Sequence, residues 1–236
     1  MLRLGQRTTT ADAEGEVIAE ATVDFTPDKL QQVQALFTGE LMQLPPMHSA
    51  LKKDGKALYE YAREGVDVER TPRRVTVYAL HLSELPTVDG VRSVALHARC
   101  SKGTYIRTLG EDIGIALGCG AFLSSLRRVQ SGIFLAKDCV TLTDLESFAE
   151  DKRHASLLPV DALLDSHQAI TLPSEDAGRF LSGLRRRGDW PDHAQVAVYG
   201  SNPHSLLGTA HVRAGELIPE RLLNPQEIQS LLESAA

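Results

Sequence analysis

Hydrophobic and polar residues alternate along two stretches near the middle of the chain, residues 73–85 and 91–100. They read RRVTVYALHLSEL and VRSVALHARC, and a period of two is typical of strands with one buried face. The stretch between them, LPTVDG, is rich in turn-forming residues, which predicts an antiparallel pair. Because strands occur in pairs here and do not alternate with helices, the pattern predicts an α+β fold with antiparallel sheet.

Two further stretches have the features of helices. Residues 26–40, TPDKLQQVQALFTGE, begin with Thr26 as a capping residue, continue with a proline suited to the first helical position, and end near Gly39. Residues 108–121 place apolar side chains at i, i+4 and i+8, on one helical face: Leu109, Ile113 and Leu117. Glycines weaken this second helix, which predicts close packing of its backbone against another element.

A short helix is predicted at residues 57–63, ALYEYAR, and Gly65 is placed to end it. Two consecutive prolines precede this segment, Pro45 and Pro46, and they require an extended backbone.

The region after the second long helix is predicted from weaker signals. Residues 122–135, FLSSLRRVQSGIFL, have the composition of a strand. Thr143 and Glu146 have the spacing of a capping box, which predicts a short helix after them.

The final third of the chain changes in character after about residue 155. It contains a linker, a helix from about Ser174, and short apolar stretches separated by turn-rich sequence such as SNPHS. We therefore predict two domains, residues 1–163 and a smaller β-rich module at 164–236. The strands expected in this module are residues 194–200, 206–212 and 215–223.

Composition and charge restrict the classes of function. The 236 residues are 42% hydrophobic, enough to bury a sizeable core. The net charge of −6 argues against a generic, charge-driven binder of nucleic acid. RNA binding depends on where the cations lie, and each cationic cluster is interpreted either as an RNA contact or as solvated surface. The clusters are Lys52, Lys53 and Lys56; Arg70, Arg73 and Arg74; Arg127 and Arg128; and Arg185, Arg186 and Arg187.

The cysteines give no sign of a disulfide framework or of a zinc site. Cys100, Cys119 and Cys139 are odd in number, far apart and outside any CxxC pair, which favours a reducing cytoplasm. No histidine lies at ligand spacing from them, so no metal is expected. The N-terminal stretch has no apolar signal region, and no stretch approaches the ~20 apolar residues of a membrane span. We expect a soluble cytoplasmic protein without a membrane partner.

The stretch CSKGTYIRTLGEDIG, residues 100–114, holds the most distinctive chemistry. If it continues the strand of residues 91–100, Tyr105 and Arg107 point to the same face, while Ile106 points into the core. An arginine there can pair with a carboxylate and keep it ionised, and a tyrosine beside it can stack on a base. On spacing alone, an ordinary surface tyrosine and arginine remain the alternative. His48 is interpreted as structural, since no triad partner is visible.

Three long stretches resemble the bacterial tRNA pseudouridine synthase B (TruB) family. They are RLGQRTTTADAEG, QLPPMHSALKKDGKALYEYAREG and CSKGTYIRTLGEDIGIALGCGAFLSSLRR, in the order the family has them. The resemblance is strong to about residue 163 and weaker through GTAHVRAGELIPERLL, which is similar to a PUA-type RNA-binding domain. It implies a catalytic domain of mixed or antiparallel sheet, a PUA-like C-terminal domain, and isomerisation of uridine-55 in the tRNA T loop. It also implies a tRNA T stem-loop as partner, no cofactor, and a monomer.

The resemblance assigns roles to individual residues. Tyr105 matches a tyrosine of the uridine pocket, Arg107 matches the arginine that pairs with the nucleophilic aspartate, and Leu126 matches a leucine that lines the pocket. The family extrudes its target base into this pocket, where aromatic and apolar side chains replace the lost stacking. From their charge alone, four residues are candidates for contacts with the RNA backbone: Lys52, Lys53, Arg127 and Arg128.

The chain departs from the family in one respect that concerns the chemistry. The family nucleophile lies in a Gly-His-Thr-Gly-x-Leu-Asp-Pro motif, and no such motif occurs in these residues. Neither Asp12 nor Asp112 has the right sequence context to replace it. We therefore expect a chain that is N-terminally truncated relative to the family, with Arg107 lacking its partner and without synthase activity. The alternative is a non-catalytic tRNA-binding protein or a remnant.

Overall fold

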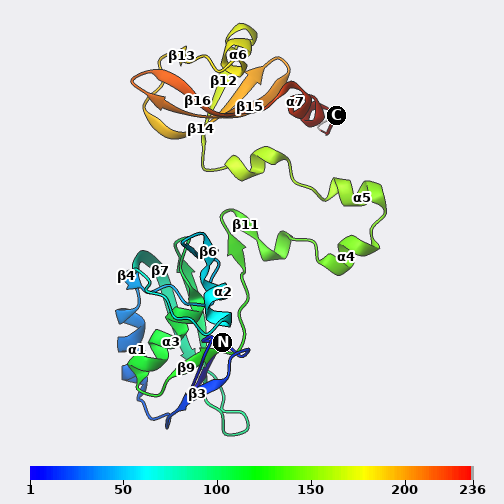
Figure 1. Ribbon diagram of the computed structural model, residues 1–236. Helices are drawn as coiled ribbons and strands as arrows, with labels where there is room; N and C mark the ends of the chain where they lie inside the picture. The colour runs from blue at the N-terminus through cyan, green and yellow to red at the C-terminus, as the bar shows by residue number, and fades with distance from the viewer. Residues whose placement is uncertain (235–236) are drawn as a thin grey trace. The chain divides into compact units, whose positions relative to one another are not determined.

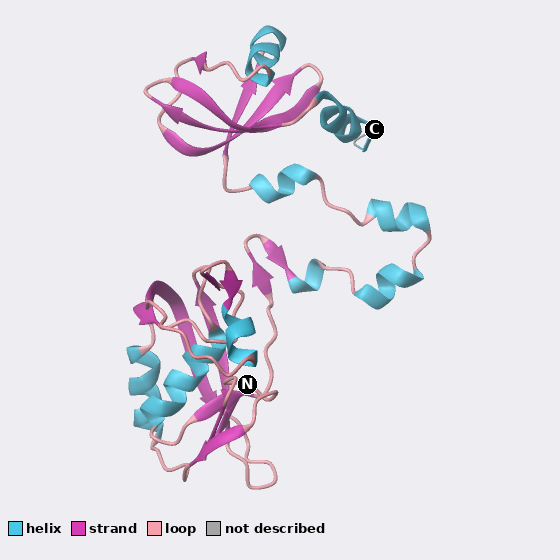
Figure 2. Ribbon diagram, viewed as in Figure 1, coloured by secondary structure: helices cyan, strands magenta, loops and turns pink. Residues whose placement is uncertain are grey.

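The structure is a computed structural model that describes residues 1–234. The chain forms two compact units, the first spanning Met1–Arg128 and the second beginning at Val129 (Figure 1). The domain boundary expected at residue 163 remains a prediction. Both units combine strands with helices, so the α+β class predicted from the strand pairing is confirmed (Figure 2).

The first unit is built on a five-stranded antiparallel sheet. The expected pair forms its centre, with Leu82 opposite Leu96, and confirms the prediction made from the alternating pattern. The first strand of the chain lies inside the sheet, where Leu2 faces Val94 on one side and Leu123 on the other. In spatial order the strands are β4 (Gly39–Gln43), β7 (Arg73–Glu84), β8 (Ser93–Cys100), β1 (Leu2–Leu4) and β9 (Ala121–Leu123).

Two helices cover this sheet and share one core with it. α1 (Pro27–Leu36) begins where predicted, because the Thr26 hydroxyl accepts a hydrogen bond from the Lys29 N–H at 3.3 Å. α3 (Ile106–Leu117) buries the apolar face that its periodicity predicted. The largest fully buried side chains of this core come from both helices and from three strands: Leu2, Val33, Val77, Val94, Leu109 and Ile113.

The glycines of α3 permit close approach of backbones, as their presence in a helix suggested. A Cβ atom added at Gly114 would lie 2.2 Å from the backbone nitrogen of Ala121, in β9. At Gly110 it would lie 2.5 Å from a methyl carbon of Leu2, in β1. Because real atoms do not approach so closely, only glycine allows α3 to lie at this distance from the sheet.

Two hairpins and a short helix complete the first unit. β2 (Gln6–Thr8) pairs with β3 (Val17–Glu20), and β5 (Lys52–Lys53) pairs with β6 (Lys56–Ala57). α2 (Leu58–Arg63) follows directly, and Gly65 lies just beyond its end with φ +72°, in agreement with the prediction.

Two predictions for the connecting region are wrong. Residues 122–135 do not form one strand. β9 ends at Leu123, and only the short pair β10 (Gln130–Ser131) and β11 (Phe134–Leu135) follows. The intervening apolar side chains are exposed, so they had no sheet face to cover.

The helix expected after Thr143 begins earlier, as α4 (Leu142–Ser147). Its cap is Thr141, whose hydroxyl accepts from the Asp144 N–H at 3.1 Å. Thr141 and Asp144 have the same spacing as the pair chosen from the sequence, which explains the error.

The second unit contains a twisted sheet with one parallel and three antiparallel pairings. The strands predicted at 194–200, 206–212 and 215–223 are present, in the order β12 (Gln168–Leu172), β14 (His193–Ser201), β15 (His204–Arg213), β16 (Glu216–Leu222) and β13 (Arg186–Arg187). α6 (Ser174–Leu181) packs on this sheet through Phe180, which is fully buried in the core of the unit. The remaining helices are η1 (Ala136–Asp138), α5 (Glu150–Ala155), η2 (Val160–Leu164) and α7 (Pro225–Ser234).

Candidate active site

Arg107 lies in the first turn of α3, and Tyr105 is the residue that precedes the helix as its N-cap. The prediction that both continue the strand before them is therefore wrong. Residues two apart along a helix are separated by about 200° around its axis, so their side chains do not share a face. Ile106 does pack against the core, as expected.

The strand ends early because of a turn rich in hydroxyl groups. Thr76, on the neighbouring β7, accepts a hydrogen bond from the Ser101 N–H at 2.8 Å and donates its own N–H to the Ser101 hydroxyl at 3.0 Å. The Thr104 hydroxyl then donates back to the Ser101 carbonyl at 2.9 Å, and Gly103 adopts φ +82°. Serine and threonine side chains compete in this way with the pairing of a strand. The chain therefore turns and starts α3.

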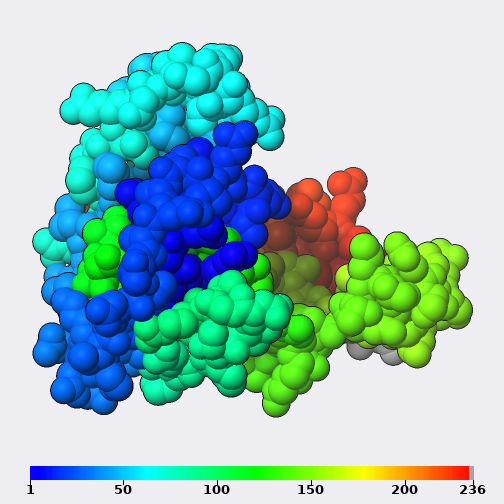
Figure 3. All heavy atoms as spheres, turned by 90° about the horizontal axis from the view of Figure 1, so that it is seen from below, coloured from blue at the N-terminus to red at the C-terminus, as the bar shows by residue number. Residues whose placement is uncertain are grey.

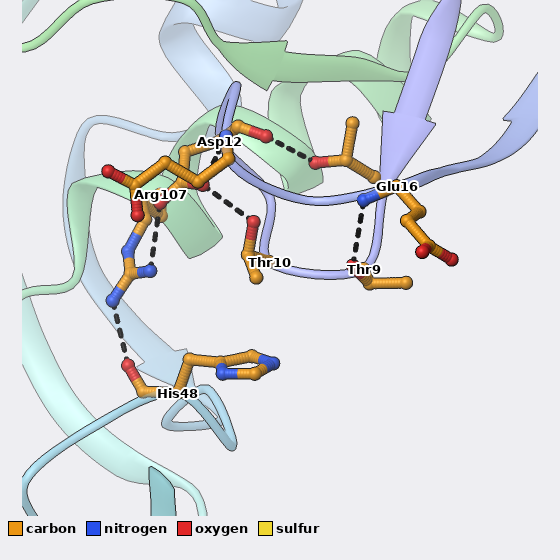
Figure 4. A network of polar contacts seen from close by, with 8 residues as sticks. Thr9, Thr10, Asp12, Glu16, His48 and Arg107 are labelled. Atoms are coloured by element: carbon orange, nitrogen blue, oxygen red, sulfur yellow. Dashed lines mark hydrogen bonds and ion pairs between the residues drawn. The ribbon is translucent and has the colours of Figure 1, made fainter. Parts of the chain in front are cut away.

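Arg107 has two partners in the fold (Figure 4). One terminal nitrogen lies 2.9 Å from a carboxylate oxygen of Asp12, and the other donates to the backbone carbonyl of His48 at 2.7 Å. Arg107 therefore has a carboxylate partner within these residues, while the expectation that it lacks the family's nucleophilic aspartate stays a prediction. Asp12 is 95 residues away along the chain, so no local pattern indicates the pair.

The Asp12 carboxylate is held ionised by its surroundings. Burial alone opposes ionisation, but hydrogen bonds from the Thr10 hydroxyl at 2.6 Å and the Glu14 N–H at 3.1 Å favour it, as does Arg107. The net effect lowers the pKa of Asp12 below its ordinary value. The side chains of Asp12 and Arg107 are 21% and 28% exposed, so a ligand can still reach the pair.

The loop that carries Asp12 connects β2 to β3 and is fixed by its threonines. The Thr8 hydroxyl donates to the backbone carbonyl of Asp12 at 2.7 Å, and the Thr9 hydroxyl accepts from the Glu16 N–H at 3.1 Å (Figure 4). The Ala11 carbonyl accepts from β9, which ties the loop to the main sheet. The run TTTAD was the available sequence signal, since such residues bond to nearby backbone.

Tyr105 is held through its backbone by Gln43, the last residue of β4. The Gln43 side-chain oxygen accepts the Tyr105 N–H at 2.8 Å, and its nitrogen donates to the Tyr105 carbonyl at 3.1 Å. Gln43 is only 4% exposed. Gln43 lies in the family-like stretch QLPPMHSALKKDGKALYEYAREG, and the resemblance assigns it no role.

A hollow of about 610 Å³ borders the Arg107–Asp12 pair. Ala11, His48 and Thr108 are in its lining, each beside or bonded to a residue of the pair. The N-terminal hairpin and the segment after β4 supply most of its walls, and these lie side by side as blue and cyan spheres in Figure 3. Its charged lining residues are Arg7, Asp67, Arg70, Glu111 and Asp112.

The charges in this hollow interact with one another. Arg7 pairs with Glu111 at 2.7 Å. Burial, and secondly the neighbouring Glu111 carboxylate, raises the pKa of Asp112. The hollow thus offers both signs of charge and hydrogen-bonding groups, which suits a polar ligand better than an apolar one.

The other predicted site residues lie on separate elements of the first unit. Leu126 is in the segment after β9 with 63% of its surface exposed, and Arg127 and Arg128 follow it at the surface. Lys52 and Lys53 form β5, on the hairpin after the prolines. The Lys53 ammonium group donates to the Glu69 carbonyl at 2.9 Å. The structure therefore connects Tyr105 and Arg107 to Gln43, Asp12 and His48, but it does not make one cluster of all predicted residues.

The arginine run of the second unit faces acidic partners. Arg186 pairs with Asp176 at 2.5 Å, while Arg185 and Arg187 both pair with Glu216, at 3.3 Å and 2.9 Å. Three cations against two carboxylates leave little excess charge. This favours the interpretation of the run as solvated surface over an RNA contact.

Other site types find no support within residues 1–234. Among these residues, no three His, Cys, Asp or Glu side chains are grouped so as to hold a metal ion. No helix in the described chain is long and apolar enough to cross a membrane. Cys100, Cys119 and Cys139 are all free thiols.

Two solved structures share the fold of this chain. One is described as the crystal structure of a Cbf5–Nop10–Gar1 complex, with a TM-score of 0.60 and 21% identity over 96% of this chain and 67% of that chain. Another is an H/ACA RNP bound to a substrate RNA containing 2′-deoxyuridine, with a TM-score of 0.62 and 20% identity over 96% of this chain and 66% of that chain. At such identities the likeness shows the fold alone, that of the pseudouridine synthases.

Three family profiles cover most of the chain. Residues 1–106 match the TruB family pseudouridylate synthase N-terminal domain, and residues 107–165 match the tRNA pseudouridylate synthase B C-terminal domain. Residues 169–223 match the C-terminal domain of pseudouridine synthase II TruB. The first two profiles meet between Tyr105 and Arg107.

Curated relatives share about half of the sequence. A tRNA pseudouridine synthase B of Verminephrobacter eiseniae (strain EF01-2) is 50% identical over 233 residues, which are 98% of this chain and 70% of the relative. The same enzyme of Ralstonia pickettii (strain 12J) is 51% identical over 95% of this chain and 73% of the relative. Together with the fold and the position of Arg107, these matches show that the chain belongs to the TruB family of pseudouridine synthases.

Proposed function

We propose that this chain serves the formation of pseudouridine in tRNA, by binding the T stem-loop and seating uridine-55 for isomerisation. The observation that carries this proposal is Arg107, held between the Asp12 carboxylate and the His48 carbonyl at the start of α3. It lies in a chain half identical to relatives named tRNA pseudouridine synthase B.

Tyr105 and Leu126 are proposed to supply the seat for an extruded base. Tyr105 offers an aromatic ring for stacking, and Leu126 offers an apolar wall, which together replace the stacking that the base loses on leaving the RNA. The polar hollow beside the pair gives room for the backbone of an RNA loop.

Arg107 has the donors to hold a second carboxylate. A guanidinium carries five N–H groups, and Asp12 and His48 each accept one. The remaining donors can face a nucleophilic aspartate and keep it ionised in a pocket whose burial opposes its charge. That aspartate attacks the nucleotide, the N1–C1′ glycosidic bond breaks, and the base rotates. A bond from C5 of the base to C1′ of the ribose forms and the aspartate is released. Loss of the C5 proton and protonation of N1, both exchanged with solvent, complete the isomerisation. No redox or metal cofactor is required by this sequence of steps.

These 236 residues contain no Gly-His-Thr-Gly-x-Leu-Asp-Pro motif. We propose that they bind the T stem-loop by themselves without isomerising it. Supplied with a family segment that carries the motif, the site becomes catalytic, and Arg107 faces the added aspartate.

The experiment compares three proteins on a T stem-loop RNA. They are this chain, a chimaera that carries the family motif segment ahead of it, and that chimaera with Arg107→Lys. We expect pseudouridine from the first chimaera only. Lysine keeps the positive charge but cannot serve Asp12, His48 and a second carboxylate with the same fixed geometry.

Two outcomes would overturn the proposal. Stoichiometric conversion by the chain itself would refute the inactivity of these residues. RNA binding without conversion by a folded chimaera would favour the alternative, a non-catalytic tRNA-binding protein.

The RNA backbone is proposed to contact Lys52, Lys53, Arg127 and Arg128. A plot of log affinity against log salt concentration has a negative slope, and each lost phosphate contact reduces the magnitude of that slope by about 1. The double variant Lys52→Ala, Lys53→Ala should therefore reduce the magnitude of the slope by about 2. Arg185→Ala is the matched control, because Arg185 is already paired with Glu216. An unchanged slope in the double variant would exclude these lysines as phosphate contacts.

We also propose that the protein is a cytoplasmic monomer, since its substrate is tRNA and one chain contains both units. Light scattering after size exclusion checks this, and a stable dimer at micromolar concentration would contradict it.

A further inference from the structure

Gln43 is an unusual residue for the interior of the first unit, because it is the largest of the polar side chains buried there, beside Thr8 and Ser49. It is 4% exposed, and glutamine is mostly found at the surface. Both ends of its side-chain amide are used on one residue, the N–H and the carbonyl of Tyr105, at 2.8 Å and 3.1 Å. A buried amide with both bonds made to a residue 62 positions away indicates a specific task.

One of these two bonds, to the Tyr105 N–H, acts where the helix has no acceptor to offer. Tyr105 is the N-cap of α3, and no side chain caps this helix end. Its carbonyl also accepts the Leu109 N–H at 3.0 Å, so the helix holds that side of the residue. Gln43 holds the N–H, as a neighbouring strand would do. The backbone of Tyr105 is thereby fixed from both sides, and with it the direction of its Cα–Cβ bond.

The same short segment also holds Arg107. His48 lies five residues after Gln43, and its carbonyl accepts from the Arg107 guanidinium at 2.7 Å. Pro45 and Pro46 lie between the two contacts and restrict the backbone there. The segment of residues 43–48 thus contacts Tyr105 through its first residue, Gln43, and Arg107 through its last, His48.

We propose that Gln43 is a positioning residue of the uridine site: its amide holds the backbone of Tyr105 so that the ring is presented to the extruded base. This inference rests on the proposed function for the identity of the ligand. The contact itself depends only on the described geometry.

Three variants separate the chemistry of the amide from its volume. Gln43→Leu keeps a side chain of similar size and removes both hydrogen bonds. Gln43→Glu keeps an acceptor for the Tyr105 N–H but removes the donor to its carbonyl. Gln34→Leu is the matched control, because the Gln34 side chain accepts one backbone hydrogen bond, from Leu82 at 2.8 Å, between α1 and β7.

The first measurement is amide hydrogen exchange at Tyr105 in the free chain. Removal of the bond to Gln43 should make exchange of this amide about tenfold faster or more in Gln43→Leu. Gln43→Glu should retain most of the protection, and Gln34→Leu should retain all of it. Equal protection of Tyr105 in the wild type and Gln43→Leu would overturn the inference.

The second measurement uses a T stem-loop RNA in which a fluorescent pyrimidine replaces the target uridine. Stacking on Tyr105 changes the emission of this base, while the affinity of the whole RNA depends largely on phosphate contacts. We expect Gln43→Leu to bind with a Kd within about twofold of the wild type but to lose most of the emission change. Gln34→Leu should keep both.

The two possible failures can be told apart. If the wild type gives the emission change and Gln43→Leu gives it in full, the positioning role is refuted while the proposed function stands. If the wild type binds no RNA, the proposed function fails and the uridine role of Gln43 fails with it. Hydrogen exchange still decides whether the amide holds Tyr105.

Discussion

Replacing Gly114 with alanine tests how closely α3 lies on β9. The added Cβ atom would lie 2.2 Å from the Ala121 nitrogen and 2.5 Å from the carbonyl carbon of Gly120. Ordinary contacts of this kind begin at 3.4 Å, and both neighbours are backbone atoms that cannot rotate away. The helix must therefore move outward, together with Arg107 in its first turn.

Two effects of opposite sign determine how much Gly114→Ala changes the free energy of unfolding. Alanine favours a helix over glycine by about 1 kcal/mol. Overpacking a close contact costs about 1–3 kcal/mol, and a clash with backbone belongs at the upper end. We expect a net loss of about 2 kcal/mol in the free energy of unfolding of the first unit. Gly178→Ala in α6 is the matched control, since nothing lies within 4 Å of its added Cβ atom. It should stabilise the second unit by about 0.5–1 kcal/mol.

Denaturant unfolding separates the two changes. The single tryptophan, Trp190, lies in the second unit, so its fluorescence follows that unit, while far-UV circular dichroism follows both. Gly114→Ala should lower the denaturant concentration at the midpoint of a transition seen by circular dichroism and leave the midpoint of the tryptophan transition unchanged. If Gly114→Ala stabilised the protein as Gly178→Ala does, α3 would not lie in backbone contact with β9 and the reasoning would be refuted.

Three further predictions follow from single contacts. The pKa of Asp12 is lowered in the fold, so its charge stabilises the fold above its ordinary pKa of 3.8, and this stabilisation is lost as the pH falls through the lower folded value. Asp12→Asn should therefore cost about 1 kcal/mol of unfolding free energy at neutral pH, and its stability should fall less on acidification than that of the wild type. The same loss of stability with acid in both proteins would contradict this. Thr26→Ala removes the cap of α1 and should cost about 1 kcal/mol by denaturant unfolding, whereas Thr26→Ser should cost little. Phe180→Ala should destabilise the second unit by about 3–5 kcal/mol, and an unmoved Trp190 transition would exclude Phe180 from its core.

Much of the fold was predictable because its signals are local. The alternation in residues 73–85 and 91–100 has a period that only a strand satisfies, and both strands form. Thr26 and the following proline mark a helix start within a few residues of sequence, and α1 begins there. The antiparallel pairing followed from the turn-forming residues between the two strands.

The site was less predictable because its contacts join distant segments. Asp12 and Arg107 are 95 residues apart, and Gln43 and Tyr105 are 62 apart, so no local pattern records either pair. The strand expected at Tyr105 failed for a different reason. The hydroxyl groups of the preceding turn end β8, and this local chemistry outweighed the strand-like composition of the residues after it.

The position of β1 inside the sheet has a consequence for the order in which the protein can fold on the ribosome. Its partners are β8 and β9, so Leu2 finds its last neighbour only when Leu123 has been made. At about 5–20 residues per second, that wait is roughly 6–24 seconds. Until then the hairpin β7–β8 can form and pair with one edge of β1, but the other edge of β1 stays unpaired. The nascent chain is thus most exposed to misassociation during the synthesis of its own first unit.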